Sequence, residues 1–279
     1  MGRPCRLHLP PLNLRMLAWP VLRAVLADLH VGQGPGDIER FVSSVAGLRQ
    51  RGANEVVILG DLFRALVGFP RFWDDTVRRG LGELASLRRD GTRVVLVEGN
   101  RDFFLDAPDL NPFRDAAGTV HSFVAGGRRF LLEHGDLINH ADRWYRFWRT
   151  VSKSGPARLW ARLLPRRLAQ RIVLGTESRL RETNFTYRRE LPIADLTAAA
   201  QMHFAAGVDV VLWGHFHRSW MLKRGDREAH VVPGWLETGT VVWIGDDGNP
   251  VIEAAETAQI VDSSSCSWYQ GHEGMPDAR

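Results

Sequence analysis

The sequence predicts an α/β fold, and three observations support this prediction. In the first half of the chain, short apolar runs alternate with amphipathic segments of helical period. Each apolar run is followed by a turn that carries glycine or aspartate, as is typical where a strand leaves a sheet. The chain has 279 residues, of which 44% are hydrophobic and 24% are charged, so it can bury a large core and is not a disordered chain.

The alternating elements occupy residues 21–100. Three apolar runs are predicted strands, at residues 21–27, 55–59 and 94–97. Between the first two lies a predicted helix that Asp37 caps and Gly52 ends; its apolar positions are Ile38, Phe41, Val42, Val45 and Leu48. A second predicted helix runs to Gly91, and its apolar positions are Val77, Leu81, Leu84 and Leu87.

From residue 120 onward the pattern changes to hairpins and helices. Predicted strands at 120–124 and 130–133 flank the turn Gly126-Gly127. Residues 141–190 are predicted to be helical with breaks at Gly155-Pro156 and Pro165, and a helix at 193–206 precedes a strand at 208–213. Two further hairpins turn at 224–226 and 246–249. We therefore divide the chain into an N-terminal extension (1–20), a main domain (21–257) with a helical insertion at about 141–190, and a polar tail (258–279).

Composition also excludes several classes of protein. No apolar run reaches the 18 or so residues that span a bilayer, and the first twenty residues mix arginines with prolines, which interrupts any signal-peptide core. Cys5 and Cys266 are too few and too far apart for a disulfide framework or a zinc ribbon. We expect a cytoplasmic protein.

Positive charge is concentrated in the predicted insertion. Residues 143–189 carry twelve arginines and one lysine against two glutamates, together with Trp144, Trp148 and Trp160. Such a segment favours an anionic partner, which can be a phospholipid surface, a nucleic acid or a phosphorylated substrate. The alternative is an ordinary solvated helical face.

Five short motifs follow predicted strands directly, and each carries a side chain that can bind a metal ion. They are Asp28-Leu29-His30, Gly60-Asp61, Gly99-Asn100-Arg101-Asp102, Glu133-His134-Gly135-Asp136 and Gly214-His215-Phe216-His217. Oxygen and imidazole ligands without thiolate suit manganese, iron or zinc in a catalytic site. One such motif alone is weak, but five at strand ends are specific. The candidate ligands are too many for one ion and suit two ions that share a carboxylate: Asp28, His30, Asp61, Asn100, His134, His215 and His217.

The order of these motifs resembles that of the calcineurin-like metallophosphoesterases over residues 21–257. This resemblance implies an α/β/β/α fold, in which two β-sheets pack face to face with helices outside and a helical insertion acts as a lid. It also implies two metal sites that share Asp61. One would be held by Asp28, His30 and His217, and the other by Asn100, His134 and His215. Two divalent ions, with manganese as the expected metal, would activate water and clamp phosphoryl oxygens.

Arg101 indicates the kind of bond that is cleaved. Most enzymes of this family have histidine after the Gly-Asn pair, where it helps to protonate an alkoxide leaving group. Arginine cannot release a proton at neutral pH, but it can neutralise phosphate charge with a bidentate fork. A phosphate monoester leaving group, with a second pKa of about 6, needs no general acid. Arg101 therefore favours a pyrophosphate substrate, with Asn100 and Arg101 as the catalytic residues.

Several details resemble one branch of the family, the pyrophosphohydrolases that cleave UDP-2,3-diacylglucosamine in lipid A synthesis at the inner membrane surface. Shared features are Gly-Asn-Arg-Asp-Phe, Gly-Asp-Leu-Phe, the insertion, and matches at Arg171, Glu182 and Trp235. The resemblance implies that substrate is bound by Asn100, Arg101, Asp142, Asn184 and His215. It also implies an acyl-chain groove along the apolar residues of the insertion and a peripheral position on an anionic membrane.

The chain departs from this branch at positions that bear on substrate rather than metal. Arg64, Leu180, Tyr187, Phe216 and Ser219 stand where the branch has other residues. One alternative is therefore a phosphodiesterase or pyrophosphatase acting on another nucleotide. A non-catalytic scaffold is disfavoured because all seven ligands are present. A nucleic-acid partner is disfavoured because the arginines alternate with aliphatic residues, and no protein partner is inferred.

Overall fold

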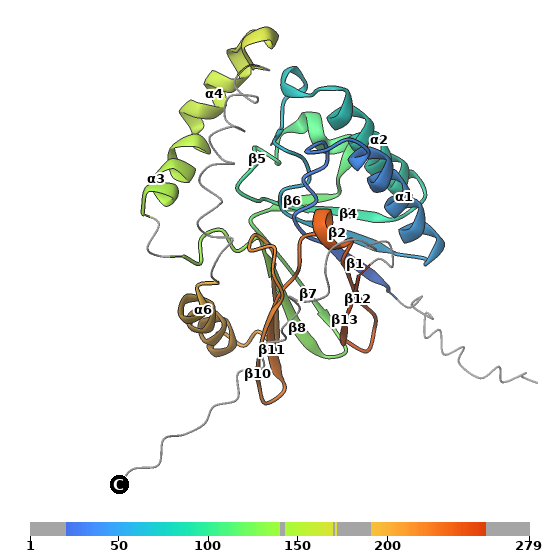
Figure 1. The fold of residues 1–279 in the computed structure, drawn as a ribbon, viewed down its shortest axis with the longest axis vertical. Helices are drawn as coiled ribbons and strands as arrows, with labels where there is room; N and C mark the ends of the chain where they lie inside the picture. The colour runs from blue at the N-terminus through green and yellow to red at the C-terminus, as the bar shows by residue number, and fades with distance from the viewer. Residues whose placement is uncertain (1–20, 140–142, 170, 172–190, 255–279) are drawn as a thin grey trace, which may run out of the picture.

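The computed structural model describes residues 21–139, 143–169, 171 and 191–254. Within these ranges, two β-sheets pack face to face and helices cover both outer faces (Figure 1). The predicted α/β/β/α architecture is confirmed. The predicted N-terminal extension and polar tail lie outside the described residues.

The first sheet has six strands in the order β13-β12-β1-β2-β4-β6. Their bounds are β1 (Arg23–Leu26), β2 (Glu55–Leu59), β4 (Arg93–Val97), β6 (Ala116–Gly118), β12 (Val241–Ile244) and β13 (Pro250–Glu253). Strands β1, β2, β4 and β6 run parallel, whereas at one edge β12 pairs antiparallel with β1 and β13 pairs antiparallel with β12. The carboxyl ends of β1, β2 and β4 therefore lie at one edge of the sheet, where ligand sites of α/β sheets form.

Two amphipathic helices, α1 (Asp37–Gln50) and α2 (Asp75–Arg89), cover the outer face of this sheet. Helix α2 is capped by Asp74, whose side chain accepts a hydrogen bond from the Val77 amide. The prediction that Asp37 caps α1 is wrong. Gly36 occupies the N-cap in a left-handed conformation, and the Asp37 carboxylate instead accepts the amide of Gly34, which fixes the loop before the helix.

The second sheet has five strands in the order β10-β11-β9-β8-β7. Their bounds are β7 (Val120–Ala125), β8 (Arg128–Glu133), β9 (Val210–Trp213), β10 (Trp220–Arg224) and β11 (Arg227–Val231). All three predicted hairpins are present, as β7–β8, β10–β11 and β12–β13. Helix α6 (Ile193–Ala205) covers the outer face of this sheet (Figure 1).

Alternation of side chains along the central strands explains the four layers. Ala24 and Leu26 of β1 point to the helix layer, while Val25 and Ala27 point to the second sheet. Because the strands are apolar on both faces, they can be buried between a helix layer and another sheet. The core between the sheets is completed by residues of the second sheet such as Phe130.

The described part of the insertion contains helices α3 (Arg143–Ser152) and α4 (Gly155–Leu163), which lie along one side of the molecule (Figure 1). After the predicted break at Pro165, residues 166–169 are helical again. The predicted break at Gly155-Pro156 is confirmed, because α3 ends at Ser152 and Ser154 is the N-cap of a new helix, α4. Short elements that the sequence did not predict complete the fold: β3 (Leu66–Val67), β5 (Asp102–Phe103), α7 (Trp235–Thr238) and the 3-10 turns Pro70–Phe72 and Pro108–Phe113. In the described ranges, no helix is both long and apolar enough to cross a membrane.

Candidate metal centre

The five sequence motifs meet where strands of both sheets end. Asp28 and His30 follow β1, Asp61 follows β2 and Asn100 follows β4, all in the first sheet. In the second sheet, His134 follows β8, and both His215 and His217 follow β9. Strands β8 and β9 are parallel neighbours, so their ends lie side by side. Contacts between these residues, given below, join all seven predicted side chains in one cluster.

An unusual backbone aims these side chains. Five of the seven residues have positive φ angles between 46° and 71°: Asp28, His30, Asp61, His215 and His217. Among the other non-glycine residues described, only Phe104 shares this conformation. A left-handed residue turns the chain out of a strand within a single position, and it persists only where the surroundings enforce it. Backbone strain of this kind is typical of functional sites.

Asp28, His30 and His217 form the first half of the cluster. The Nε2 atoms of His30 and His217 are 3.2 Å apart and both point toward the same place. Two nitrogens that bind one metal ion at about 2.1 Å lie roughly 3.0–3.4 Å apart. Asp28 Oδ1, buried and without a hydrogen-bond partner, lies 3.7 Å from His217 Nε2 and 3.9 Å from His30 Nε2. This donor set fits a divalent cation.

Asn100, His134 and His215 form the second half. Asn100 Oδ1 lies 3.0 Å from His134 Nε2 and 3.1 Å from His215 Nδ1. Asp61 stands between the halves, because its Oδ1 is 3.8 Å from His134 Nε2 and its Oδ2 is 3.8 Å from His30 Nε2. The two oxygens of one carboxylate thus face one imidazole in each half.

Two glycines make room for this cluster. A Cβ atom on Gly60 would lie 2.1 Å from His134 Nδ1, and one on Gly99 would lie 2.3 Å from Asp61 Oδ1. Both distances are far below van der Waals contact. The motif glycines therefore let the backbone pass directly behind the candidate ligands.

Surrounding groups fix the orientation of the ligands. His134 Nδ1 lies 3.0 Å from the Leu59 carbonyl and His217 Nδ1 lies 3.0 Å from Glu237 Oε1, so the Nε2 atom of each ring faces the centre. The Asp102 carboxylate accepts hydrogen bonds from the amides of Asp61 and Gly99. The sequence reasoning gave no role to Asp102 or Glu237. Asp102 is the last residue of the motif Gly99-Asn100-Arg101-Asp102, so its place in the chain was a signal. Glu237 lies on a single-turn helix, and no sequence pattern indicated it.

Burial and mutual proximity shift the pKa values of the cluster in opposite directions. Burial alone would raise the pKa of Asp61, but His134, His30 and Arg101 outweigh it and bring the pKa to about 2. Burial would lower the pKa of His134, but Asp61 and Asp28 raise it to about 9. His215 is buried beside His134, which lowers its pKa to about 4. The cluster thus holds ionised carboxylate close to imidazole, which favours binding of a cation.

Arg101 lies at the edge of the cluster. Its side chain is only 2% exposed, and its Nε atom is 3.6 Å from Asp61 Oδ2. The Nε and Nη1 atoms have no hydrogen-bond partner, which is unusual for a buried guanidinium. Its main-chain amide donates to Asp61 Oδ1 over 2.9 Å. Unused donors beside a cation site suit an oxyanion.

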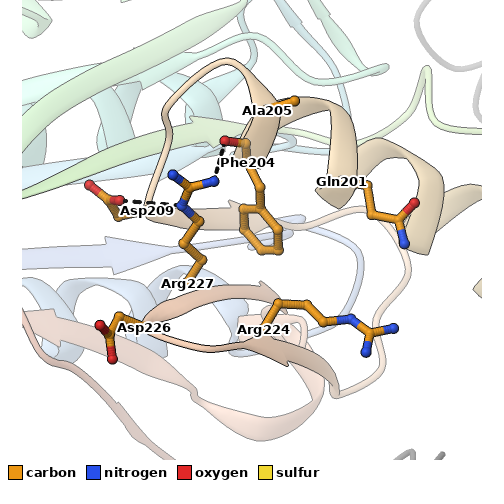
Figure 2. A pocket seen from close by; sticks show the side chains of 7 residues that line it. All are labelled: Gln201, Phe204, Ala205, Asp209, Arg224, Asp226 and Arg227. Atoms are coloured by element: carbon orange, nitrogen blue, oxygen red, sulfur yellow. Dashed lines mark hydrogen bonds and ion pairs between the residues drawn. The ribbon is translucent and has the colours of Figure 1, made fainter.

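The two remaining predicted substrate residues, Asp142 and Asn184, lie outside the described residues, so their placement relative to the cluster stays a prediction. A separate hollow lies between the end of α6 and the β10–β11 hairpin (Figure 2). There Arg227 of β11 donates to the Phe204 carbonyl of α6, which links hairpin to helix, and its Nε atom lies 3.8 Å from Asp209 Oδ1. Asp209 precedes β9 whereas His215 follows it, which places this hollow at the opposite end of that strand from the motifs.

A two-sheet sandwich with carboxylate, imidazole and amide ligands at its strand ends defines a metal-dependent phosphoesterase. The chain belongs to the calcineurin-like phosphoesterase family, whose model matches residues 23–219. The chain is thus a metal-dependent hydrolase, and the enzymes of its family use a dinuclear site of divalent metal ions.

Relatives are similar to this chain over most of their length. A protein of Ralstonia nicotianae named UDP-2,3-diacylglucosamine hydrolase is 32% identical, with 75% of this chain and 82% of the relative covered. Proteins of the same name from Pseudomonas syringae pv. tomato and Pseudomonas putida are 32% and 30% identical. Each alignment covers 80% of this chain, and 92% and 95% of the respective relatives.

Proposed function

We propose that this chain hydrolyses the pyrophosphate of UDP-2,3-diacylglucosamine to UMP and 2,3-diacylglucosamine 1-phosphate. The relatives named above carry this activity in their names and align over most of both chains. The observation that carries the choice of a pyrophosphate is Arg101, a buried guanidinium with unused donors beside Asp61.

In this proposal two divalent ions, manganese in each site, occupy the two halves of the cluster. Asp28, His30 and His217 would hold the first ion, Asn100, His134 and His215 would hold the second, and Asp61 would serve both. When bound, such a pair of ions supplies Lewis acidity and a water nucleophile at neutral pH. Asp61, with a pKa of about 2, stays ionised throughout the physiological range.

The residues around the metals act on the diphosphate. The oxygen of water forms a bond to one phosphorus and its protons are released to bulk water, while the anhydride bond to the other phosphate breaks and the electron pair leaves with that phosphate. The leaving group is a phosphate monoester with a second pKa of about 6, so it departs without receiving a proton. The guanidinium of Arg101 neutralises charge on the diphosphate, and Asn100 and His215 contact the same group.

The insertion is proposed to bind the lipid part of the substrate and an anionic membrane surface, while Asp142 and Asn184 contact the substrate. Six large apolar side chains of α3 and α4 are 48–75% exposed: Trp144, Phe147, Trp148, Leu159, Trp160 and Leu163. Exposed arginines lie among and after them, at Arg143, Arg162, Arg166 and Arg167. Aromatic and aliphatic side chains next to basic ones suit the interface of an anionic bilayer. The proposed location is the cytoplasmic face of the inner membrane.

Release of UMP from UDP-2,3-diacylglucosamine in the presence of Mn²⁺ tests this function. We expect turnover of this substrate and little turnover of UDP-sugars without acyl chains. If soluble nucleotide diphosphates or cyclic nucleotides are cleaved while the lipid substrate is untouched, the lipid assignment is wrong and the alternative of another nucleotide substrate holds.

A further inference from the structure

Helix α3 of the insertion contacts the motif loop that carries His134. Both Tyr145 and Arg149 donate hydrogen bonds to the same atom, Asp136 Oδ2, and the distance from Arg149 Nε is 2.7 Å. The side chain of Asp136 is 4% exposed and that of Arg149 is 14% exposed. Asp136 lies two residues after His134, separated from it only by Gly135. The position of this loop is therefore tied to a helix outside the sandwich.

One turn further along, α3 contacts a second motif loop. Lys153, directly after α3, donates to Glu98 Oε1 and to the Gly99 carbonyl, both over 2.7 Å. Lys153 and Glu98 are 12% and 16% exposed, so this ion pair is largely shielded from water. Asn100 is the residue that follows Gly99. The two loops that α3 reaches thus carry Asn100 and His134, which belong to the same half of the cluster.

These polar contacts are the main attachment of α3 to the sandwich. None of the residues of α3 is buried, so apolar packing contributes little to its position. Helix α4 is attached differently, because Ala161 and the following Leu164 are buried in the core beneath the helix layer. The Arg158–Asp106 ion pair, whose Asp106 is 66% exposed, and the Arg71 contact with the Leu164 carbonyl add to this packing. Asp106 lies outside the five motifs. The two helices of the insertion therefore differ in what they can transmit to the metal centre.

We propose that Arg149, Tyr145 and Lys153 are positioning residues, which hold the loops of His134 and Asn100 in ligating geometry so that this half of the centre is completed by the docked insertion. This inference rests on the dinuclear site of the proposed function. Groups behind a ligand commonly change metal affinity by about 10–100-fold when they are removed. The half that contains His30 and His217 should respond much less, because the contacts of Arg149, Tyr145 and Lys153 described above are with the loops of His134 and Asn100.

Titration with Mn²⁺ tests the inference without relying on activity. Wild-type protein is expected to bind two ions. Arg149→Met should bind one ion normally and the other at least about tenfold more weakly, and Lys153→Met should weaken the same ion. Arg158→Met is the matched control, since it removes an arginine of the insertion that pairs with a residue outside the motifs, and it should keep both affinities. Electron paramagnetic resonance should show loss of the coupled Mn²⁺ pair in the first two variants alone.

The outcomes separate this inference from the proposed function. If wild-type protein binds fewer than two ions, the dinuclear site itself is wrong. The positioning role alone is wrong if wild-type protein binds two ions and Arg149→Met binds both with wild-type affinity. The same conclusion follows if Arg158→Met loses as much affinity for the second ion as Arg149→Met does. Should Arg149→Met fail to fold, Tyr145→Phe and Lys153→Met decide. A weakened second ion in either supports the role, and wild-type affinities in both overturn it.

Discussion

The β-sandwich and the helical insertion differ in the contacts that stabilise each of them. In the sandwich, strands apolar on both faces are buried between layers, and the candidate ligands are fixed by backbone turns, glycines and hydrogen bonds. In the described insertion, most large apolar side chains face outward, and α3 is attached through Asp136, Glu98 and Gly99. The sandwich fixes the positions of the candidate ligands, and the insertion exposes apolar side chains on its surface.

This difference indicates that the sandwich carries the metal centre and that the insertion binds the substrate. Each of the seven candidate ligands belongs to the sandwich, whereas the exposed apolar and basic side chains proposed to bind lipid belong to the insertion. Changes in the sandwich should therefore affect metal binding and turnover together. Changes in the insertion should affect the substrate, the membrane and, through α3, one half of the centre.

The largest effect is expected from Asp61→Ala, which removes the carboxylate that faces both halves. Metal assistance is worth several kcal/mol, so turnover should fall by roughly 10³-fold or more, and metal content should fall with it. Turnover and metal content measured on the same sample test this. Glu39→Ala, which removes a surface carboxylate paired with Arg79, is the control and should change neither. Two ions retained in Asp61→Ala would contradict the bridging role.

A smaller effect is expected from Arg101→Ala, because this residue is proposed to act on the diphosphate and not on the metals. Loss of one preorganised charged donor should lower turnover by roughly 10²-fold while both ions stay bound. Arg101→Lys, which keeps the charge without the planar fork, should be intermediate. If Arg101→Ala loses as much metal as Asp61→Ala, the side chain serves the metal site instead.

Metal affinity should depend on pH because a proton competes for His134. With its pKa at about 9, His134 is protonated at pH 7 in the absence of metal, and binding must displace that proton. Burial lowers the pKa of His30 well below its usual value. Burial also brings the pKa of His215 to about 4, so the His215 ring is already neutral above pH 6. Apparent affinity for Mn²⁺ should thus fall about tenfold per unit as pH drops from 8 to 6. A flat profile over this range would contradict the raised pKa.

The smallest effect concerns the membrane. Replacing Trp144 and Trp148 by serine should weaken binding to anionic phosphatidylglycerol vesicles by up to about tenfold, since partial burial of an aromatic ring is worth roughly 1–2 kcal/mol. Cosedimentation measures it, and turnover of a water-soluble diphosphate should be unaffected. Met202→Ser is the control, because Met202 is 65% exposed on α6, outside the insertion. Equal losses in the control, or no preference for anionic vesicles, would argue against a membrane surface on α3.

The elements that sequence predicts well are those long enough to show a period. Helices α1, α2 and α6 and the central strands each carry several apolar positions at regular spacing, and the ligand motifs follow those strands directly. Strands β3 and β5 have two residues each and α7 has four, which is too short for any periodic pattern. Gly36 replaces Asp37 as the cap of α1 because a turn that needs positive φ overrides the usual preference for a side-chain cap.

The parts of the site that sequence cannot reveal are contacts between distant segments. Asp136 belongs to one of the five motifs and Lys153 to the basic segment. However, the ion pairs Asp136–Arg149 and Lys153–Glu98 depend on where α3 lies in three dimensions. Glu237 reaches His217 from a turn that carries no motif. Spacing in the chain gives the identity of ligands, and only the folded arrangement gives the groups behind them.

The amide of His215 donates to Asp28 Oδ2 across 187 residues of chain. During synthesis, a nascent polypeptide that has not yet extended past β9 possesses strands β1, β2, β4 and β8 but lacks His215 and His217. In the proposed function, both ions can therefore be bound only after β9 has joined β8, and amino-terminal fragments should be catalytically inert. Metal loading can then serve as a sign that translation and folding of the two sheets are complete.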